Sequence, residues 1–191
     1  MKLKKRWCVS LISLFAFLSP AGAVEFNAVQ LNQSKIDFTF RQMGVPLTGE
    51  FRKFSAQISF DPAKPEQAKS VIEIDLASID AGNDEANDEV KGPQWFNTKV
   101  YPSARFESSS VRALGGDRYE VSGTMRIKGK GRPLTASFSV KQGTGVATFD
   151  GNFVLKRGDY AIGDGPWADY GTVANEIQVH FRIPVAARTG K

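Results

Sequence analysis

The chain has 191 residues, which is enough for one domain with a sizeable hydrophobic core. Four of its 25 basic residues stand in the first six positions, and the other 21 are nearly balanced by 20 acidic residues, so the net charge of +5 does not indicate a nucleic-acid partner. The one cysteine, Cys8, excludes a disulfide within the chain.

The first 23 residues have the pattern of a cleaved export signal. A basic start is followed by an apolar segment over residues 7–18 and by Ala21-Gly22-Ala23, a small-residue cleavage site. The apolar segment is too short to span a bilayer. We therefore expect a signal peptide over residues 1–23 and a single domain over residues 24–191 that is exported to the periplasm.

Alternating apolar and polar residues predict β-strands along the rest of the chain. Side chains on a strand point to opposite faces in turn, so each alternating segment has one apolar face and one polar face. Such one-sided strands are typical of antiparallel sheets, and the Gly, Pro and Asp turns between them favour a sandwich or barrel. Phe51 is out of phase with the strand that follows it, which predicts a bend near residues 52–53. The strands are expected at residues 35–40, 54–60, 71–76, 105–111, 119–128, 134–141, 147–155 and 176–185.

One short helix is expected directly after Asn83. Asn83 is a good N-cap, and Gly92-Pro93 ends the helix. The acidic residues around its start suit the positive end of the helix dipole. They leave open a cation-binding or acid–base role, but their spacing lacks the ligand pattern of a calcium loop, and we expect no metal site. They are Asp80, Asp84, Glu85, Asp88 and Glu89.

The apolar faces of these strands are expected to enclose an interior. An interior with small residues on its face either is filled by neighbouring side chains or keeps room for one ligand. These small residues are Gly123, Ala136, Ala147 and Gly151. The aromatic residues after the helix either line the mouth or simply cover the core; they include Trp95, Phe96, Trp167 and Tyr170. The residues expected to line the interior are Phe38, Phe40, Phe54, Ile58, Phe60, Ile72, Ile74, Trp95, Phe96, Phe106, Met125, Ile127, Phe138, Phe149, Phe153, Phe181 and Ile183.

Several segments in order resemble one known family. They are residues 44–51 (GVPLTGEF), 74–79 (IDLASI), 95–102 (WFNTKVYP) and 155–165 (LKRGDYAIGDG). The chain resembles the YceI-like family of exported lipid-binding proteins through nearly all of residues 29–185. This resemblance implies an all-β fold, a lipocalin-like antiparallel barrel of about eight strands with one short helix beside it. It also implies a long polyisoprenoid or related amphiphile as the guest, and hence a periplasmic carrier of a polyprenyl phosphate or quinone-type lipid with no other cofactor.

Cationic residues offer candidates for binding the lipid headgroup. Lys130 and Arg132, in the basic segment 128–132, either meet an anionic headgroup or a membrane surface or form a solvated turn. Arg157 either holds a pyrophosphate or pairs with Asp159 to order its loop. A transient contact with a membrane surface is compatible with these residues, and the sequence defines no oligomeric state.

We expect no catalytic residues and no enzyme. His180 is the only histidine and its strand phase faces water, which excludes a metal site built from His and Cys and leaves no nucleophile–base pair. Two other classes of function stay open. They are a lipid-processing enzyme that uses the carboxylates near residues 80–89, and a stress-protective interaction protein that uses the barrel only as a scaffold.

Overall fold

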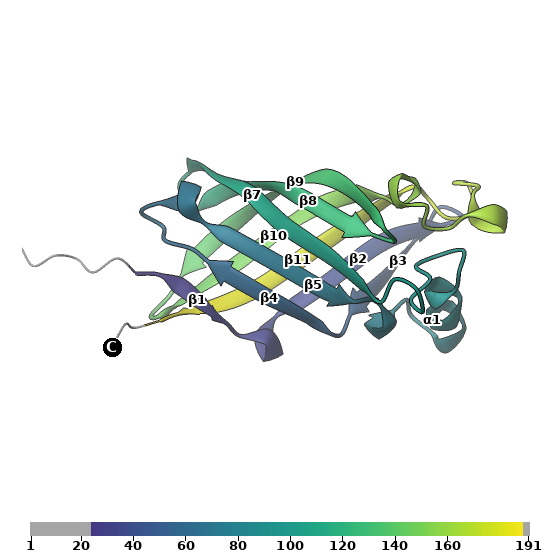
Figure 1. Ribbon diagram of the computed structural model, residues 1–191, viewed down its shortest axis with the longest axis horizontal. Helices are drawn as coiled ribbons and strands as arrows, with labels where there is room; N and C mark the ends of the chain where they lie inside the picture. The colour runs from purple at the N-terminus through teal and green to yellow at the C-terminus, as the bar shows by residue number, and fades with distance from the viewer. Residues whose placement is uncertain (1–23, 189–191) are drawn as a thin grey trace, which may run out of the picture.

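Eleven antiparallel strands form one strongly curled sheet in the computed structural model, which describes residues 24–188 (Figure 1). Neighbours along the sheet follow the order β4-β5-β7-β8-β9-β10-β11-β2-β3-β6, and β1 pairs with β11 beside β2. The strands are β1 (Phe26–Val29), β2 (Lys35–Gln42), β3 (Val45–Phe51), β4 (Phe54–Ser59), β5 (Lys69–Asp75), β6 (Ile79–Asp80), β7 (Ser103–Gly115), β8 (Arg118–Ile127), β9 (Lys130–Gln142), β10 (Val146–Lys156) and β11 (Glu176–Ala187).

The expectation of about eight strands is wrong. The sequence prediction missed β3, where Pro46 and Gly49 interrupt the alternation that marks other strands. It also missed two short strands, β1 and β6, each of which lies next to a turn of 3-10 helix along the chain. The result is a curled, half-barrel sheet in place of an eight-stranded barrel.

The predicted strands are present, and so is the bend predicted before one of them. Each predicted strand overlaps an observed one. β2, β7, β9, β10 and β11 extend beyond their predicted limits, whereas β4 and β5 end one residue earlier than predicted. In β8 the residues predicted to face inward, Tyr119, Val121, Met125 and Ile127, are all buried. The strand break between Phe51 and Phe54 lies where the change of phase predicts a bend.

Helix α1 (Asp84–Lys91) lies beside one end of the curled sheet (Figure 1). As predicted, Asn83 is its N-cap: the Asn83 side-chain oxygen accepts a hydrogen bond from the amide of Ala86 at 2.8 Å. Across residues 24–188, no helix has the length and apolar character needed to cross a membrane. The remaining short turns are 3-10 helices: η1 (Leu31–Gln33), η2 (Pro65–Gln67), η3 (Leu76–Ser78), η4 (Arg157–Tyr160) and η5 (Gly165–Trp167).

A cluster of packed aromatic rings lies around Phe60. Its ring makes edge-to-face contacts with Tyr119 and Phe149, with ring centres 5.3 and 5.1 Å away. Tyr119 in turn stacks on Phe138. Phe60 directly follows β4 and pairs with Phe26 of β1, and β1 lies at the opposite end of the sheet from α1 (Figure 1). The predicted signal peptide lies outside the described residues.

Candidate functional site

Two adjoining chambers lie inside the curl of the sheet. A narrow chamber has a volume of about 110 Å³ and a wide chamber about 480 Å³. Both are lined by Ile74, Met125, Phe153 and Val179, so these four residues mark the junction between them. The volume of the wide chamber is within the range usual for small-molecule sites.

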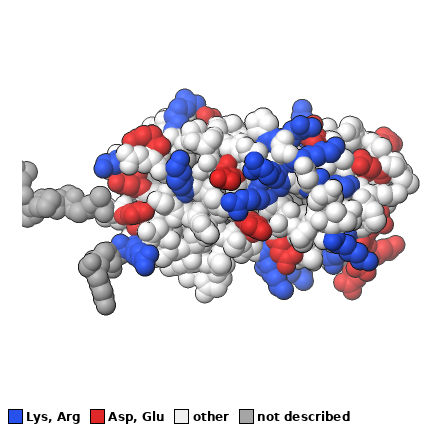
Figure 2. Space-filling view, in the orientation of Figure 1, with Lys and Arg blue, Asp and Glu red and all other residues white. Residues whose placement is uncertain are grey.

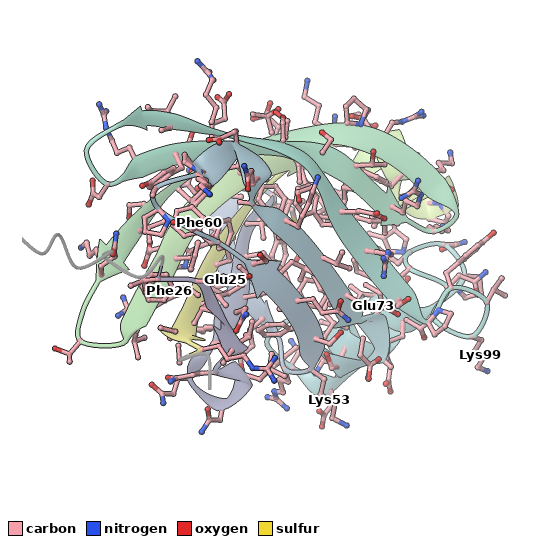
Figure 3. All side chains as sticks on the ribbon, turned by 60° about the vertical axis from the view of Figure 1, so that its left-hand side comes forward. Glu25, Phe26, Lys53, Phe60, Glu73 and Lys99 are labelled. Carbon is pink, nitrogen blue, oxygen red and sulfur yellow. The ribbon has the colours of Figure 1, made fainter. Side chains whose placement is uncertain are left out.

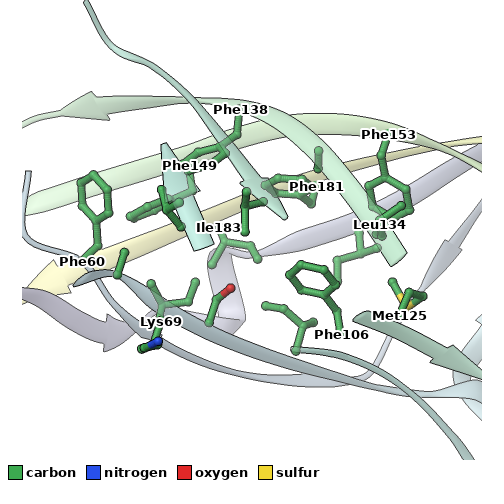
Figure 4. Close-up of a pocket in the computed structure, with 18 of the residues that line it drawn as sticks. Phe60, Lys69, Phe106, Met125, Leu134, Phe138, Phe149, Phe153, Phe181 and Ile183 are labelled. Carbon is green, nitrogen blue, oxygen red and sulfur yellow. The ribbon is translucent and has the colours of Figure 1, made fainter. Parts of the chain in front are cut away.

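The narrow chamber is surrounded by aromatic and aliphatic side chains. Phe60, Phe106, Phe138, Phe149 and Phe181 converge on it from five different strands or their ends (Figure 4). Ser59, Lys69 and Ser70 also line it, near the β4–β5 hairpin. In Figure 4 the nitrogen of Lys69 points away from Phe138 and Phe149. This chamber therefore presents an almost wholly apolar surface to a guest.

The inward-facing glycines make room for the protein's own rings. A Cβ atom added at Gly151 would lie 2.6 Å from Cβ of Phe138 and 2.6 Å from Cζ of Phe181. At Gly123 it would lie 2.7 Å from the ring of Phe106. Of the alternatives left by the sequence, the filled core is correct at these two positions. The chambers lie elsewhere on the same inner face, with Ala136 lining the narrow one.

The wide chamber is apolar inside and polar only at part of its lining. Phe38, Phe40, Trp95 and Phe96 lie along its length, with Trp95 packed against Trp167 at a ring distance of 5.4 Å. Both tryptophans line the chamber, so they do not only cover the hydrophobic core. The polar residues of the lining are Gln42, Asn83, Glu85, Glu89 and Arg157.

Nearly all residues predicted to line the interior do so. Phe54 is the exception: it lines neither chamber and instead packs, partly buried, against the cluster of Ile36 and Phe38. The prediction missed Ile162 and Val173, which lie in the loops between β10 and β11. No strand period marks those loop positions, so the sequence held no signal for them.

Arg157 is buried and does not offer its charge to a headgroup. It is 1% exposed, and its guanidinium donates to the carbonyl oxygens of Ile162, Gly163 and Val173 at 2.8–2.9 Å. Further bonds reach the carbonyls of Ala174, Trp167 and Asp169. Removal from water lowers the pKa of Arg157.

Neither alternative predicted for Arg157 describes these contacts. All its hydrogen bonds go to backbone carbonyls, and within residues 24–188 it forms no ion pair with Asp159. Its Cζ atom also lies 4.9 Å from the ring centre of Tyr170. Arg157 therefore organises the loops that connect β10 to β11, a structural role.

The other cationic candidates lie outside the chambers. Lys130 and Arg132 are exposed at the start of β9, and the turn itself consists of Lys128 and Gly129, both with positive φ. Lys128, in the same basic segment, is 11% exposed, and its Nζ donates to the carbonyl of Ala161 at 2.6 Å. Burial lowers the pKa of Lys128. Lys128 thus ties together the loop after α1 and the loop between β10 and β11, through the carbonyls of Gln94 and Ala161.

A family profile for the YceI-like domain matches residues 28–185 of this chain. The chain belongs to the YceI-like family. Its sequence is 28% identical over 155 residues to a UPF0312 protein of Azotobacter vinelandii, with 78% of this chain and 79% of that protein aligned.

Several solved structures share the fold. BcnA of Burkholderia cenocepacia superposes with a TM-score of 0.80 at 43% identity, covering 82% of this chain and 98% of BcnA. A polyisoprenoid-binding domain from Saccharophagus degradans, implicated in plant cell wall breakdown, gives a TM-score of 0.67 at 16% identity, covering 85% of this chain and 98% of that domain. A YceI protein of Campylobacter jejuni gives 0.67 at 22% identity, covering 74% and 85%.

Two of the acidic residues near α1, Asp80 and Glu89, have structural partners in this YceI-like domain. Asp80 accepts hydrogen bonds from the amide of Gly82 and the side chain of Asn87, and it pairs with Arg52. Glu89 accepts a hydrogen bond from the indole of Trp95 at 3.2 Å. Within residues 24–188, no three His, Cys, Asp or Glu side chains come together in a group that could hold a metal ion.

His180 lies on the outer face of the sheet, as its strand phase predicts. Its Nδ1 is 3.4 Å from a carboxylate oxygen of Asp37, and its Nε2 is 3.2 Å from one of Asp150. These partners come from β2 and β10, the two strands on either side of β11. His180 lines neither chamber, so it takes no direct part in holding a guest.

Proposed function

We propose that this protein binds a long-chain isoprenoid lipid, of the polyprenyl phosphate or quinone type, and carries it with the tail inside the two chambers. The observation that supports this proposal is the pair of adjoining apolar chambers, which run from the rings around Phe60 to the residues beside α1. The polyisoprenoid-binding domain of Saccharophagus degradans, which shares the fold, gives independent support.

The apolar lining can supply most of the affinity for such a lipid. Burying one CH₂ group contributes about 0.8 kcal/mol, so a five-carbon isoprene unit contributes roughly 3 kcal/mol before costs are subtracted. Ordering of the tail and loss of its free motion offset part of that gain. A tail of several units therefore needs few polar contacts, which fits chambers whose polar residues are few.

A non-catalytic role is part of the proposal. The polar groups of the wide chamber are two amides, two carboxylates and an Arg157 whose donors are occupied, and they include no nucleophile beside a base. The only histidine lies on the opposite face of the sheet. A binding protein needs none of these groups to react.

The periplasm is the proposed location, on the strength of the signal-like first 23 residues. Expression of the full chain followed by cell fractionation tests it. The protein is expected in the periplasmic fraction with Val24 as its first residue. Retention in the cytoplasm with an intact N-terminus would argue against export.

Native mass spectrometry of the gently purified protein tests the binding itself. We expect a second population heavier by the mass of one lipid, which solvent extraction then identifies as an isoprenoid. A useful comparison is Ala136→Phe, which adds a ring to the lining of the narrow chamber and should reduce the occupied fraction. Folded protein that is always empty, and that also fails to bind added polyprenol, would contradict the proposal.

A further inference from the structure

Two carboxylates and one cation line the wide chamber. Glu85 and Glu89 line it from one face of α1, four residues apart and therefore on adjacent turns. Acidic residues gather at the lower right of Figure 2, over the end of the molecule where Figure 1 shows α1. The narrow chamber at the other end is nearly free of polar groups, so the wide chamber is where a headgroup meets polar protein atoms.

Positive charge is not available to a guest in the wide chamber. Of the described residues that line it, Arg157 is the only cation, and its guanidinium is occupied by backbone carbonyls. Lys128 lies nearby but lines neither chamber, and its ammonium is held by the carbonyl of Ala161. A phosphate in this chamber would therefore face two carboxylates without a free cation to offset them.

The N-terminus of α1 does not reverse this balance. The positive end of a helix can attract an anion through its free amide groups. Here the side chain of Asn83 already binds the amide of Ala86, and Asp84 and Glu85 occupy the first turn. The local charge at this end of the helix is negative.

We propose that Glu85 and Glu89 select against anionic headgroups, so that the guest is an isoprenoid with an uncharged head such as an alcohol, phenol or quinone. The lipid lies with the tip of its tail in the narrow chamber and its head beside α1. This inference rests on the proposed function and narrows it, because it favours a quinone-type lipid over a polyprenyl phosphate.

A pair of lipids that differ only in the head tests the selection. The affinity of the mature chain for geranylgeraniol and for geranylgeranyl phosphate is measured from the fluorescence of Trp95 and Trp167, both of which line the wide chamber. We expect the phosphate to bind weaker by on the order of tenfold, since its charge is repelled by two carboxylates in partly solvated surroundings. The ratio should shrink at high salt.

Two double variants of the same helix identify the residues responsible. Glu85→Gln/Glu89→Gln keeps side-chain size and the acceptor for the Trp95 indole, and should bring the two affinities to within about threefold of each other. Asp84→Asn/Asp88→Asn removes the same charge from positions that line neither chamber, and should leave most of the difference in place.

Equal binding of the two lipids by the unaltered protein would overturn the selection by Glu85 and Glu89 while leaving lipid binding intact. An equal effect of the two double variants on the ratio of the two affinities would overturn it as well. Failure of both lipids to bind would instead remove the proposed function, and this inference with it.

Discussion

Phe26 and Phe60 exchange two backbone hydrogen bonds. The amide of Phe26 donates to the carbonyl of Phe60 at 2.9 Å, and the amide of Phe60 donates back at 3.1 Å. Phe26 begins β1 and Phe60 directly follows β4, so this pair links β4, at one end of the sheet order, to β1 beside β11. The two residues lie side by side in Figure 3. The link joins β1 to the end of β4 beside the narrow chamber, which the ring of Phe60 lines.

Phe60→Ala should destabilise the protein by about 3–5 kcal/mol, because it removes a fully buried ring and leaves a cavity beside the narrow chamber. Phe60 is 1% exposed and contacts the rings of Tyr119 and Phe149. Urea unfolding followed by circular dichroism measures the change. Val154→Ala, at a half-exposed site on β10, is the control and should change stability by less than about 0.5 kcal/mol.

Gly151→Ala should cost about 1–3 kcal/mol through overpacking. The added methyl would meet Phe138 and Phe181, whose positions are fixed by strands on either side. The same substitution at Gly143 adds a methyl near one carbonyl at 3.7 Å and should be almost neutral. Equal stabilities of the two variants would show that Gly151 faces free space after all.

Arg157→Lys should destabilise the protein by about 3 kcal/mol although the charge is kept. Lysine has three donors on one atom and cannot reach the carbonyls of Ile162, Val173 and Trp167 together, so some buried oxygens lose their partners. Near-ultraviolet circular dichroism should also change, since Trp95 and Trp167 pack beside these loops. Arg182→Lys, on the exposed outer face, is the matched control.

Met125→Trp should shorten the longest tail that the protein binds. Met125 lines both chambers, so a larger side chain there obstructs the passage between them. Affinity for a long polyprenol should fall at least about tenfold, because each excluded isoprene unit forfeits several CH₂ groups. Affinity for a short prenol, which fits the wide chamber alone, should change little. A uniform loss for all tail lengths would indicate general disruption instead.

Acid should weaken the contacts of Asp80 beside α1. The hydrogen bond from the amide of Gly82, aided by Asn87 and Arg52, lowers the pKa of Asp80 from its ordinary value of 3.8. A carboxyl whose pKa is lowered by folding stabilises the fold above its unfolded pKa, and that stabilisation is lost as the pH falls through the folded value.

The unfolding free energy measured from pH 7 to pH 2 tests this dependence. Asp80→Asn should be less stable than the unaltered protein at neutral pH and should lose less stability as the pH falls. Asp88→Asn, at an exposed position of α1, should follow the pH profile of the unaltered protein. If Asp80→Asn also followed that profile, the shift at Asp80 would have no part in acid stability.

Local patterns in the sequence were enough to predict much of the fold. The alternation in residues 119–128 predicted both the strand β8 and the face that is buried, because the two-residue period of a strand is set by backbone geometry alone. Asn83 and Gly92 gave the limits of α1 for an equally local reason, the need of helix ends for hydrogen-bond partners. The sequence did not predict β3, because Pro46 and Gly49 break the alternation of apolar and polar residues. Pairing with β2 nevertheless holds this strand in place.

By itself the sequence determined which residues are apolar, which of them alternate, and which family the order of segments resembles. Only the tertiary structure decided which inner positions are filled and which are open, since rings from the adjacent strands cover Gly123 and Gly151 but leave the chambers beside them. It also decided the role of Arg157, whose partners are backbone carbonyls from a later loop that carry no mark in the amino-acid sequence. Packing volume and backbone hydrogen bonds between distant segments depend on three-dimensional neighbours, and no local pattern encodes them.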